Sequence, residues 1–308
     1  MKLTVFYDHV RGAMRQTGLS LEEIGAILNK KGVTGIEADY EELEASGFAM
    51  AKELAAVGLP IHSVYKRFDW SHHPEAEDYE EVLNRLQSCG IHYMLVIPGF
   101  VDVPEDMPLT MEHAFSPEFT AKKEAARKNM LPNVKKLCDA APKYDVHITM
   151  EDYDDLSAAF STKEELAWFF ERVPNLGCAF DTGNFFYSCQ EAMEAFELLK
   201  NRITYVHCKD RSFEQLYPDQ LLFTKGTAGD GNREKTDLRL LLPKEDTKAR
   251  LDGKPMFSAP VGGGVIPMTE ILKKLKAQGY DGTYAIEHFG SVNHMEWMLQ
   301  SAEYLTSF

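Results

Sequence analysis

The amino-acid sequence predicts a single (β/α)₈ TIM barrel, and three observations lead to that fold class. Short apolar runs with the composition of buried strands alternate with longer segments of helical periodicity, which is typical of parallel βαβ units. Eight runs of the first kind and about eight of the second fit within the 308 residues. No glycine-rich phosphate loop follows the first run, as an open doubly wound sheet of the dinucleotide-binding kind would require.

The expected strands are each six to eight residues long, near the usual length of a buried strand. They cover residues 2–8, 35–40, 60–66, 93–98, 145–151, 176–182, 203–210 and 282–288. The first helical segment after strand 2–8 begins at Ser20, a favourable N-cap, and ends at Gly32. Further helical patterns occupy 40–58, 78–90, 118–143 and 268–279.

The composition excludes several classes of protein. Asp and Glu number 48 against 33 Lys and Arg, which gives a net charge of −15 and disfavours a nucleic-acid-binding surface. The hydrophobic fraction of 44% supplies ample material for a core, so disorder is not the main state. No apolar run is long enough for a membrane span. None of the five cysteines forms a C-x-x-C pair, and we expect a reduced, cytoplasmic protein without disulfides.

We expect one domain over residues 1–308, with a long insertion at about 211–264 after the seventh strand. Segments that follow strands lie at the catalytic face of a barrel, and long loops in compact domains usually have a function. Residues 221–236 have the composition of a lid. A solvated insertion and an oligomer contact are equally open interpretations.

One potential metal ligand lies at or near the carboxyl end of each of the last four expected strands. They are Glu151, Asp181, His207 and Glu287. Because side chains alternate between the two faces of a strand, each shares a face with small or polar residues and opposes an apolar face. The four side chains are therefore expected to point into the barrel at the same height.

Three carboxylates and one imidazole suit a single divalent cation. The oxygen-rich set favours Mn²⁺ or Mg²⁺, with Mn²⁺ preferred, and Zn²⁺ and Co²⁺ remain open. Without a cation, three inward carboxylates would repel one another, and at least one would have to be protonated.

The order and spacing of several short motifs resemble those of the xylose isomerase-like TIM barrels, a superfamily of sugar isomerases and epimerases that includes inosose dehydratases and endonuclease IV. The motifs are VTGIEADY, LPIHSVY, HITMED, CAFDTGN, YVHCKD, GGGVIP and GTYAIEH. The resemblance extends over essentially the whole chain. It implies that the same four residues bind the metal, and that Glu151 and Glu287 exchange a proton with a bound sugar.

Three positions depart from the relatives. Asn184 and Ile97 stand where endonuclease IV carries additional metal-binding histidines, so the resemblance implies one metal ion and disfavours DNA repair. Ketose 3-epimerases also carry a histidine at the position of Asn184, and their arginine lies farther beyond the strand-7 histidine than Arg211 does. A 3-epimerase of free ketoses is accordingly not the direct expectation.

Five residues are candidate substrate contacts: His62, Glu37, Asn184, Lys209 and Arg211. His62 is assigned to the end of the third strand, and a hydrogen-bonded structural histidine is the alternative. Glu37 faces inward and either orients a neighbouring group or forms a structural ion pair. Lys209 shares the inward face of His207 and, with Arg211, could hold an anionic or enediolate oxygen.

The leading function is a metal-dependent isomerase or epimerase that removes a proton next to the carbonyl of a small polyhydroxylated substrate. A dehydratase or lyase of a keto-sugar or cyclitol on the same metal site is the runner-up. A non-catalytic sugar-binding barrel is the third alternative. We expect a sugar or sugar derivative as the ligand, no nucleic-acid or membrane partner, and, by family habit, a homo-oligomer.

Overall fold

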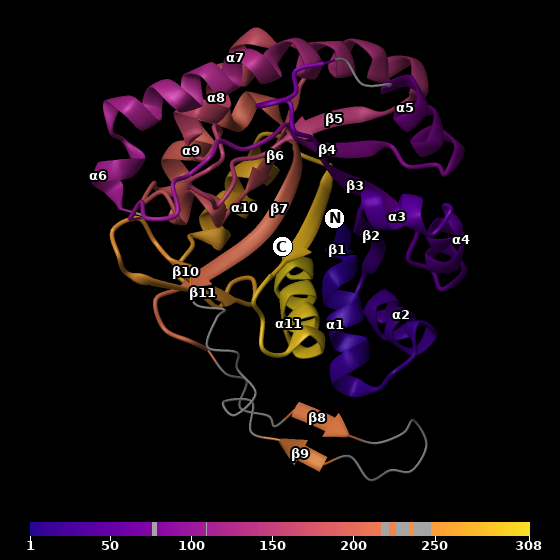
Figure 1. Ribbon diagram of the computed structural model, residues 1–308. Coiled ribbons are helices and arrows are strands. Elements are labelled where there is room, and N and C mark those ends of the chain that lie inside the picture. Colours follow the sequence, from indigo (N-terminus) through magenta and orange to yellow (C-terminus); the bar gives the residue numbers. More distant parts are fainter. Residues whose placement is uncertain (76–78, 109, 217–221, 226–233, 237–247) are drawn as a thin grey trace.

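A computed structural model describes residues 1–308 except 76–78, 109, 217–221, 226–233 and 237–247. Eight parallel strands form a closed barrel surrounded by helices, as the sequence predicts (Figure 1). The barrel closes because the last strand pairs with the first strand on one side and with the seventh on the other. In chain order the barrel strands are β1 (Lys2–Phe6), β2 (Val33–Asp39), β3 (Ile61–Arg67), β4 (Tyr93–Ile97), β5 (His147–Met150), β6 (Gly177–Asp181), β7 (Ile203–Ser212) and β12 (Thr283–Glu287).

The helices cover the outside of the barrel (Figure 1). Helix α2 begins with the expected cap, in which the Ser20 side chain accepts from the Glu23 amide and the Glu23 carboxylate accepts from the Ser20 amide. The α-helices are α1 (Tyr7–Thr17), α2 (Leu21–Lys30), α3 (Tyr40–Ala45), α4 (Ala49–Ala56), α5 (Tyr79–Ser88), α6 (Met111–Ala114), α7 (Pro117–Ala140), α8 (Lys163–Arg172), α9 (Ala192–Leu199), α10 (Met268–Ala277) and α11 (His294–Thr306). Short 3₁₀ turns occupy Ala141–Tyr144, Asn184–Phe186 and Lys200–Arg202.

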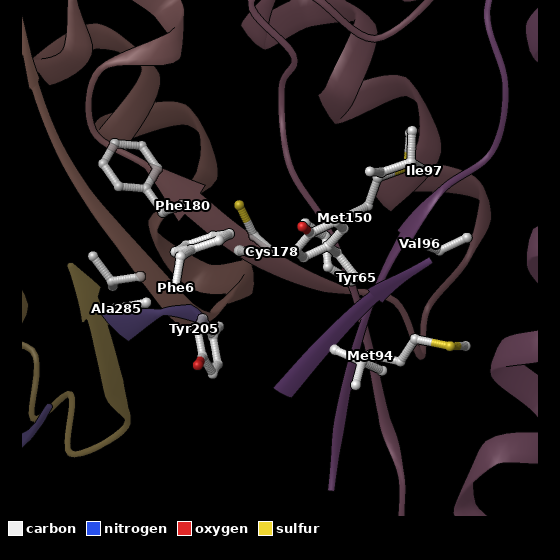
Figure 2. Packing of buried hydrophobic residues seen from close by; sticks show 14 of the residues in the cluster. Phe6, Tyr65, Met94, Val96, Ile97, Met150, Cys178, Phe180, Tyr205 and Ala285 are labelled. Carbon is white, nitrogen blue, oxygen red and sulfur yellow. The ribbon is translucent and has the colours of Figure 1, made fainter. Parts of the chain in front are cut away.

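The core has an outer layer between strands and helices and an inner layer inside the barrel, and Figure 2 shows residues from both. Phe180 on β6 belongs to the outer layer, because its ring packs edge-on against that of Phe196 on α9, with the ring centroids 5.7 Å apart. Tyr205 on β7 belongs to the inner layer, where its hydroxyl lies 3.2 Å from that of Thr4 on β1. Side chains alternate between the two faces of a strand, so every second residue of each barrel strand points into the barrel.

His62 lies at the amino end of the barrel, so its assignment to the end of the third strand is wrong. It is the second residue of β3, and its Nε2 lies 2.6 Å from the hydroxyl of Thr283, the first residue of β12. Between β2 and β3 the register shifts, with Ile36 opposite Ile61 and Glu37 opposite Ser63. His62 is therefore the extra residue of a β-bulge, a feature set by the neighbouring strand rather than by the local sequence.

Part of the predicted insertion pairs with the barrel sheet. Strand β11 (Pro255–Ala259) pairs antiparallel with the end of β7, and the short β10 (Lys248–Ala249) pairs with β11. Strands β8 (Leu222–Lys225) and β9 (Glu234–Thr236) form a separate hairpin. Most of the predicted lid, 221–236, lies outside the described residues. Within the described ranges, no helix combines the length and apolar character needed to cross a bilayer.

Asp210 fixes the loop that leads from β11 to α10. Its Oδ1 accepts from the amides of Arg211 and Ile266, and its Oδ2 accepts from those of Gly262 and Gly264, at 2.8 to 3.1 Å. A side chain at Gly264 would collide with the Arg211 carbonyl and the Asp210 carboxylate. The GGGVIP segment therefore wraps around one buried carboxylate of β7.

Candidate metal centre

Glu151, Asp181, His207 and Glu287 converge at the carboxyl end of the barrel. Glu151 directly follows β5, Asp181 ends β6, His207 lies within β7 and Glu287 ends β12. One ligand atom from each lies within 4.8 Å of all the others. The side chains are buried, with at most 6% of each residue exposed. The strands β5, β6, β7 and β12 are consecutive neighbours in the barrel, which brings their carboxyl ends together.

His207 is held between carboxylates on both of its ring nitrogens. Its Nδ1 faces the cluster, 2.6 Å from Glu151 Oε2 and 3.5 Å from Glu287 Oε2. Its Nε2 lies 3.1 Å from Oε2 of Glu37, which is fully buried behind the ring on β2. Glu37 therefore orients the imidazole, an arrangement common for metal-binding histidines.

The four side chains fit a divalent cation, because two of their carboxylate oxygens lack hydrogen bonds among the described residues. Asp181 Oδ1 is satisfied by the amides of Gly183 and Asn184, both at 2.7 Å. Asp181 Oδ2 and Glu287 Oε2 are buried and accept no hydrogen bond from the described residues, although Lys209 Nζ and His207 Nδ1 lie 3.3 and 3.5 Å away, respectively. Buried carboxylate oxygens are rarely left without a donor, and a cation would satisfy both. Three carboxylates and one imidazole are suited to a hard or borderline metal ion.

The electrostatics of the cluster shift the protonation of its members. Burial, together with the charge of Asp181, raises the pKa of Glu287 to about 8, against the lowering effect of Lys209. Burial also raises the pKa of Glu151, with His207 opposing the shift. For His207, burial favours the neutral ring, but the charges of Glu37 and Glu151 outweigh it and raise the pKa well above its ordinary value. The carboxylates of Glu151 and Glu287 are therefore more basic than ordinary glutamates.

Lys209 lies beside the cluster and contacts two of its carboxylates. Its Nζ is 2.5 Å from Glu287 Oε1 and 3.3 Å from Asp181 Oδ2, and it donates to Asn184 Oδ1 at 2.6 Å. Burial favours the neutral amine, but Asp181 and Glu287 outweigh burial and raise the pKa of Lys209. The lysine is therefore a fixed cation at the edge of the centre.

A cavity of about 600 Å³ opens onto the centre. Three of the predicted substrate contacts, Asn184, Lys209 and Arg211, line it together with Glu151 and Glu287. His62 does not line this cavity, because it lies at the opposite end of the barrel, and Glu37 lies behind His207. We no longer assign His62 a contact with substrate.

Several lining residues were not anticipated from the sequence: Asp8, Asp39, Glu42, Arg67, Tyr153, Asp154 and Phe289. Asp39 and Arg67 end β2 and β3, and Asp8 comes shortly after β1. Their position at the carboxyl ends of strands, where barrel sites lie, was the available signal. The sequence does not separate such residues from surface charges, because their pairing depends on neighbouring strands.

A second group of imidazoles, His9, His288 and His294, also has ligand atoms within 4.8 Å of one another. The rings of His9 and His288 are stacked, with centroids 4.0 Å apart and planes inclined by only 15°. Their in-plane lone pairs therefore do not converge on one point, as a metal ion would require. His9 Nε2 instead accepts from the His288 amide, which ties α1 to the end of β12.

The fold and the buried cluster define a TIM barrel whose carboxyl face carries a metal-type site of three carboxylates and one histidine. The chain belongs to the xylose isomerase-like TIM barrel family, whose sequence model matches residues 26–308.

No curated protein matches the sequence significantly. Among solved structures, the probable 3-DHS dehydratase AsbF from Bacillus anthracis is similar, with 16% identity, 99% of each chain covered and a TM-score of 0.62. The IolI protein with a bound zinc atom is 17% identical, covering 99% of this chain and 96% of its own, with a TM-score of 0.61. D-Psicose 3-epimerase from Clostridium cellulolyticum H10, solved with D-tagatose, is 14% identical over 100% of this chain and 97% of its own, with a TM-score of 0.61. At these identities the likeness shows the fold.

Proposed function

We propose that this protein is a divalent-metal-dependent isomerase or epimerase, which removes a proton next to the carbonyl of a small polyhydroxylated substrate. The observation that carries the proposal is the pair Glu151 and Glu287. Both line the cavity, both have a raised pKa, and both approach Nδ1 of His207. Carboxyl groups whose pKa lies nearer neutrality are suited to accept and return a proton.

Glu151, Asp181, His207 and Glu287 would hold the cation, and Mn²⁺ is the ion we favour for this oxygen-rich set. Bound there, the cation would polarise the substrate carbonyl and so make the neighbouring C–H proton acidic. Mg²⁺, Co²⁺ and Zn²⁺ are the alternatives to test, and a zinc atom is present in the similar IolI structure.

The chain supplies proton transfer and positioning. One of the two glutamates removes the proton, and the other returns it to the same or the neighbouring carbon. Asp181 and the Glu37-bound His207 keep the cluster fixed, since their other polar atoms are held by Gly183, Asn184 and Glu37. Lys209 donates toward the cluster and can stabilise negative charge that develops on a substrate oxygen.

Loss of water from a keto-sugar or cyclitol is the second candidate function. It starts with the same proton abstraction and differs only in the departure of a β-hydroxyl group. The similarity to a probable 3-DHS dehydratase supports keeping it.

Solvent exchange tests the proposal. The Mn²⁺-loaded protein is incubated in D₂O with ketoses, sugar acids and inososes, and products are followed by NMR and mass spectrometry. Deuterium incorporation with isomerisation supports the first function, and incorporation with loss of water supports the second. Glu151→Gln and Glu287→Gln should each abolish exchange, whereas the exposed Glu164→Gln should retain it. Substrate binding without exchange in any condition would leave only the non-catalytic sugar-binding barrel.

A further inference from the structure

The cavity walls outside the metal centre carry more negative than positive charge. Four carboxylates lie there, from Asp8, Asp39, Glu42 and Asp154. The positively charged side chains among the described lining residues are Lys209 and two arginines, Arg67 and Arg211. A phosphate or carboxylate on a substrate would have to find its partner among these three cations.

Each of these cations is already paired with a carboxylate of the site. Arg211 Nη2 lies 2.5 Å from Asp154 Oδ2, and both side chains are largely buried. Arg67 Nη1 lies 3.1 Å from Asp39 Oδ2. Lys209 is held by Glu287 and Asp181. An anionic ligand would therefore have to compete with the carboxylate that already compensates each cation, which is unfavourable in a partly buried site.

The metal centre does not offset the excess negative charge of the cavity walls. The charges of a divalent ion and Lys209 are balanced by the carboxylates of Glu151, Asp181 and Glu287. Behind the lining, Arg11 contacts Asp8 at 2.5 Å and Glu42 at 2.8 Å, and so is engaged as well. The cavity thus has no uncommitted positive charge in the described part of the chain.

The lining instead offers many hydrogen-bond acceptors. Carboxylate oxygens accept hydrogen bonds, and the hydroxyl groups of a sugar donate them, whereas a phosphate dianion has only acceptors. An uncharged polyhydroxylated ligand can therefore use both the carboxylates and the paired cations without displacing either.

We infer that the cavity selects an uncharged polyhydroxylated carbonyl compound and discriminates against phosphorylated or carboxylated ones. The inference rests on the proposed function, because it specifies the substrate class of the same site. It separates free sugars and inososes from sugar phosphates and from carboxylated compounds such as 3-dehydroshikimate.

Matched ligand pairs test the inference by binding. The Mn²⁺-loaded protein is titrated by ligand-observed NMR with D-fructose and D-fructose 6-phosphate, and with an inosose and 3-dehydroshikimate. We expect each uncharged member to bind at least about tenfold more tightly, the order of effect of one unbalanced charge at a few ångströms. Tighter binding of the anionic members, or no binding by any of the four compounds, would overturn the inference.

Charge-removing variants provide a second arm. Asp39→Asn and Glu42→Gln should each strengthen binding of the anionic ligands by several-fold relative to binding of the uncharged ligands. Asn retains the helix-capping ability of Asp39, whose carboxylate accepts from the Glu41 and Glu42 amides. The exposed Glu164→Gln is the control that removes one charge away from the cavity. Equal effects of all three variants would indicate a general charge effect and contradict the inference.

The two proposals fail in different ways. A preference for uncharged ligands without any deuterium exchange would remove the isomerase proposal and keep the charge preference. Exchange that is fastest with an anionic compound would support the isomerase proposal and overturn the charge preference.

Discussion

Glu37 Oε2 lies 3.1 Å from Nε2 of His207, and this contact joins β2 to β7 across the inside of the barrel. These two strands do not pair with each other, so the contact depends on the closed barrel rather than on a shared edge. Both side chains are fully buried. Glu37 thereby sets the direction in which Nδ1 of His207 points.

Glu37→Gln should weaken metal affinity by about 10- to 100-fold, the usual effect of removing a carboxylate behind a metal-binding histidine. Isothermal titration with Mn²⁺ measures the change. Glu44→Gln, an exposed substitution on α3, should leave the affinity unchanged. Unchanged affinity in Glu37→Gln would mean that the contact does not hold His207 for a metal.

The purified protein should contain about one divalent ion per chain, and Asp181→Asn should reduce the content to a small fraction of that. The reason is that Asp181 contributes a buried oxygen that accepts no hydrogen bond from the described part of the chain. Mass spectrometry of metals, with circular dichroism as the folding check, measures both. No ion in either protein after incubation with Mn²⁺, Co²⁺, Zn²⁺ or Mg²⁺ would refute the metal centre.

His62→Ala should destabilise the protein without affecting metal binding. The substitution removes the 2.6 Å hydrogen bond to Thr283 at the amino end of the barrel, for an expected loss of about 1–3 kcal/mol in the free energy of unfolding. Denaturant titration and Mn²⁺ binding provide the two readouts. A large loss of metal affinity at unchanged stability would restore His62 to the site.

Acid should destabilise the fold through His294, whose pKa burial lowers to about 4. The unfolded chain takes up the proton near the ordinary pKa of 6.5, so between pH 6.5 and 4 it binds more protons than the folded state does. Stability should therefore fall as the pH falls through that window, by up to about 1.4 kcal/mol per pH unit.

Urea unfolding at several pH values measures this slope. His294→Gln should flatten it, whereas His73→Gln, whose side chain is 72% exposed, should not. An unchanged slope in His294→Gln would show that other groups cause the acid sensitivity.

Much of the barrel could be predicted because each strand and its following helix carry their own local patterns. The eight strands are confirmed, but their ends differ. β7 continues to Ser212 because β11 pairs with its end, and β5 stops at Met150, one residue before Glu151. The end of a strand depends on its pairing with the neighbouring strands, and the sequence of one segment does not contain that information.

The convergence of the four cluster residues followed from the alternation of side chains along parallel strands. The ion pairs of the cavity wall could not be predicted in this way. The contacts of Arg67 with Asp39 and of Arg211 with Asp154 join separate elements, and each depends on side-chain packing above the strand ends. His62 was misplaced because its bulge arises from the pairing of β2 with β3.

The position of Glu287 on β12 has a consequence for how the protein matures. Strand β12 is the last of the barrel in the chain, and it reaches its place by pairing with β1, the first. A chain that has placed β1 to β7 holds three of the four side chains of the cluster and an open edge. A cation held by all four side chains would therefore bind only the closed barrel, and its binding would stabilise the barrel against reopening.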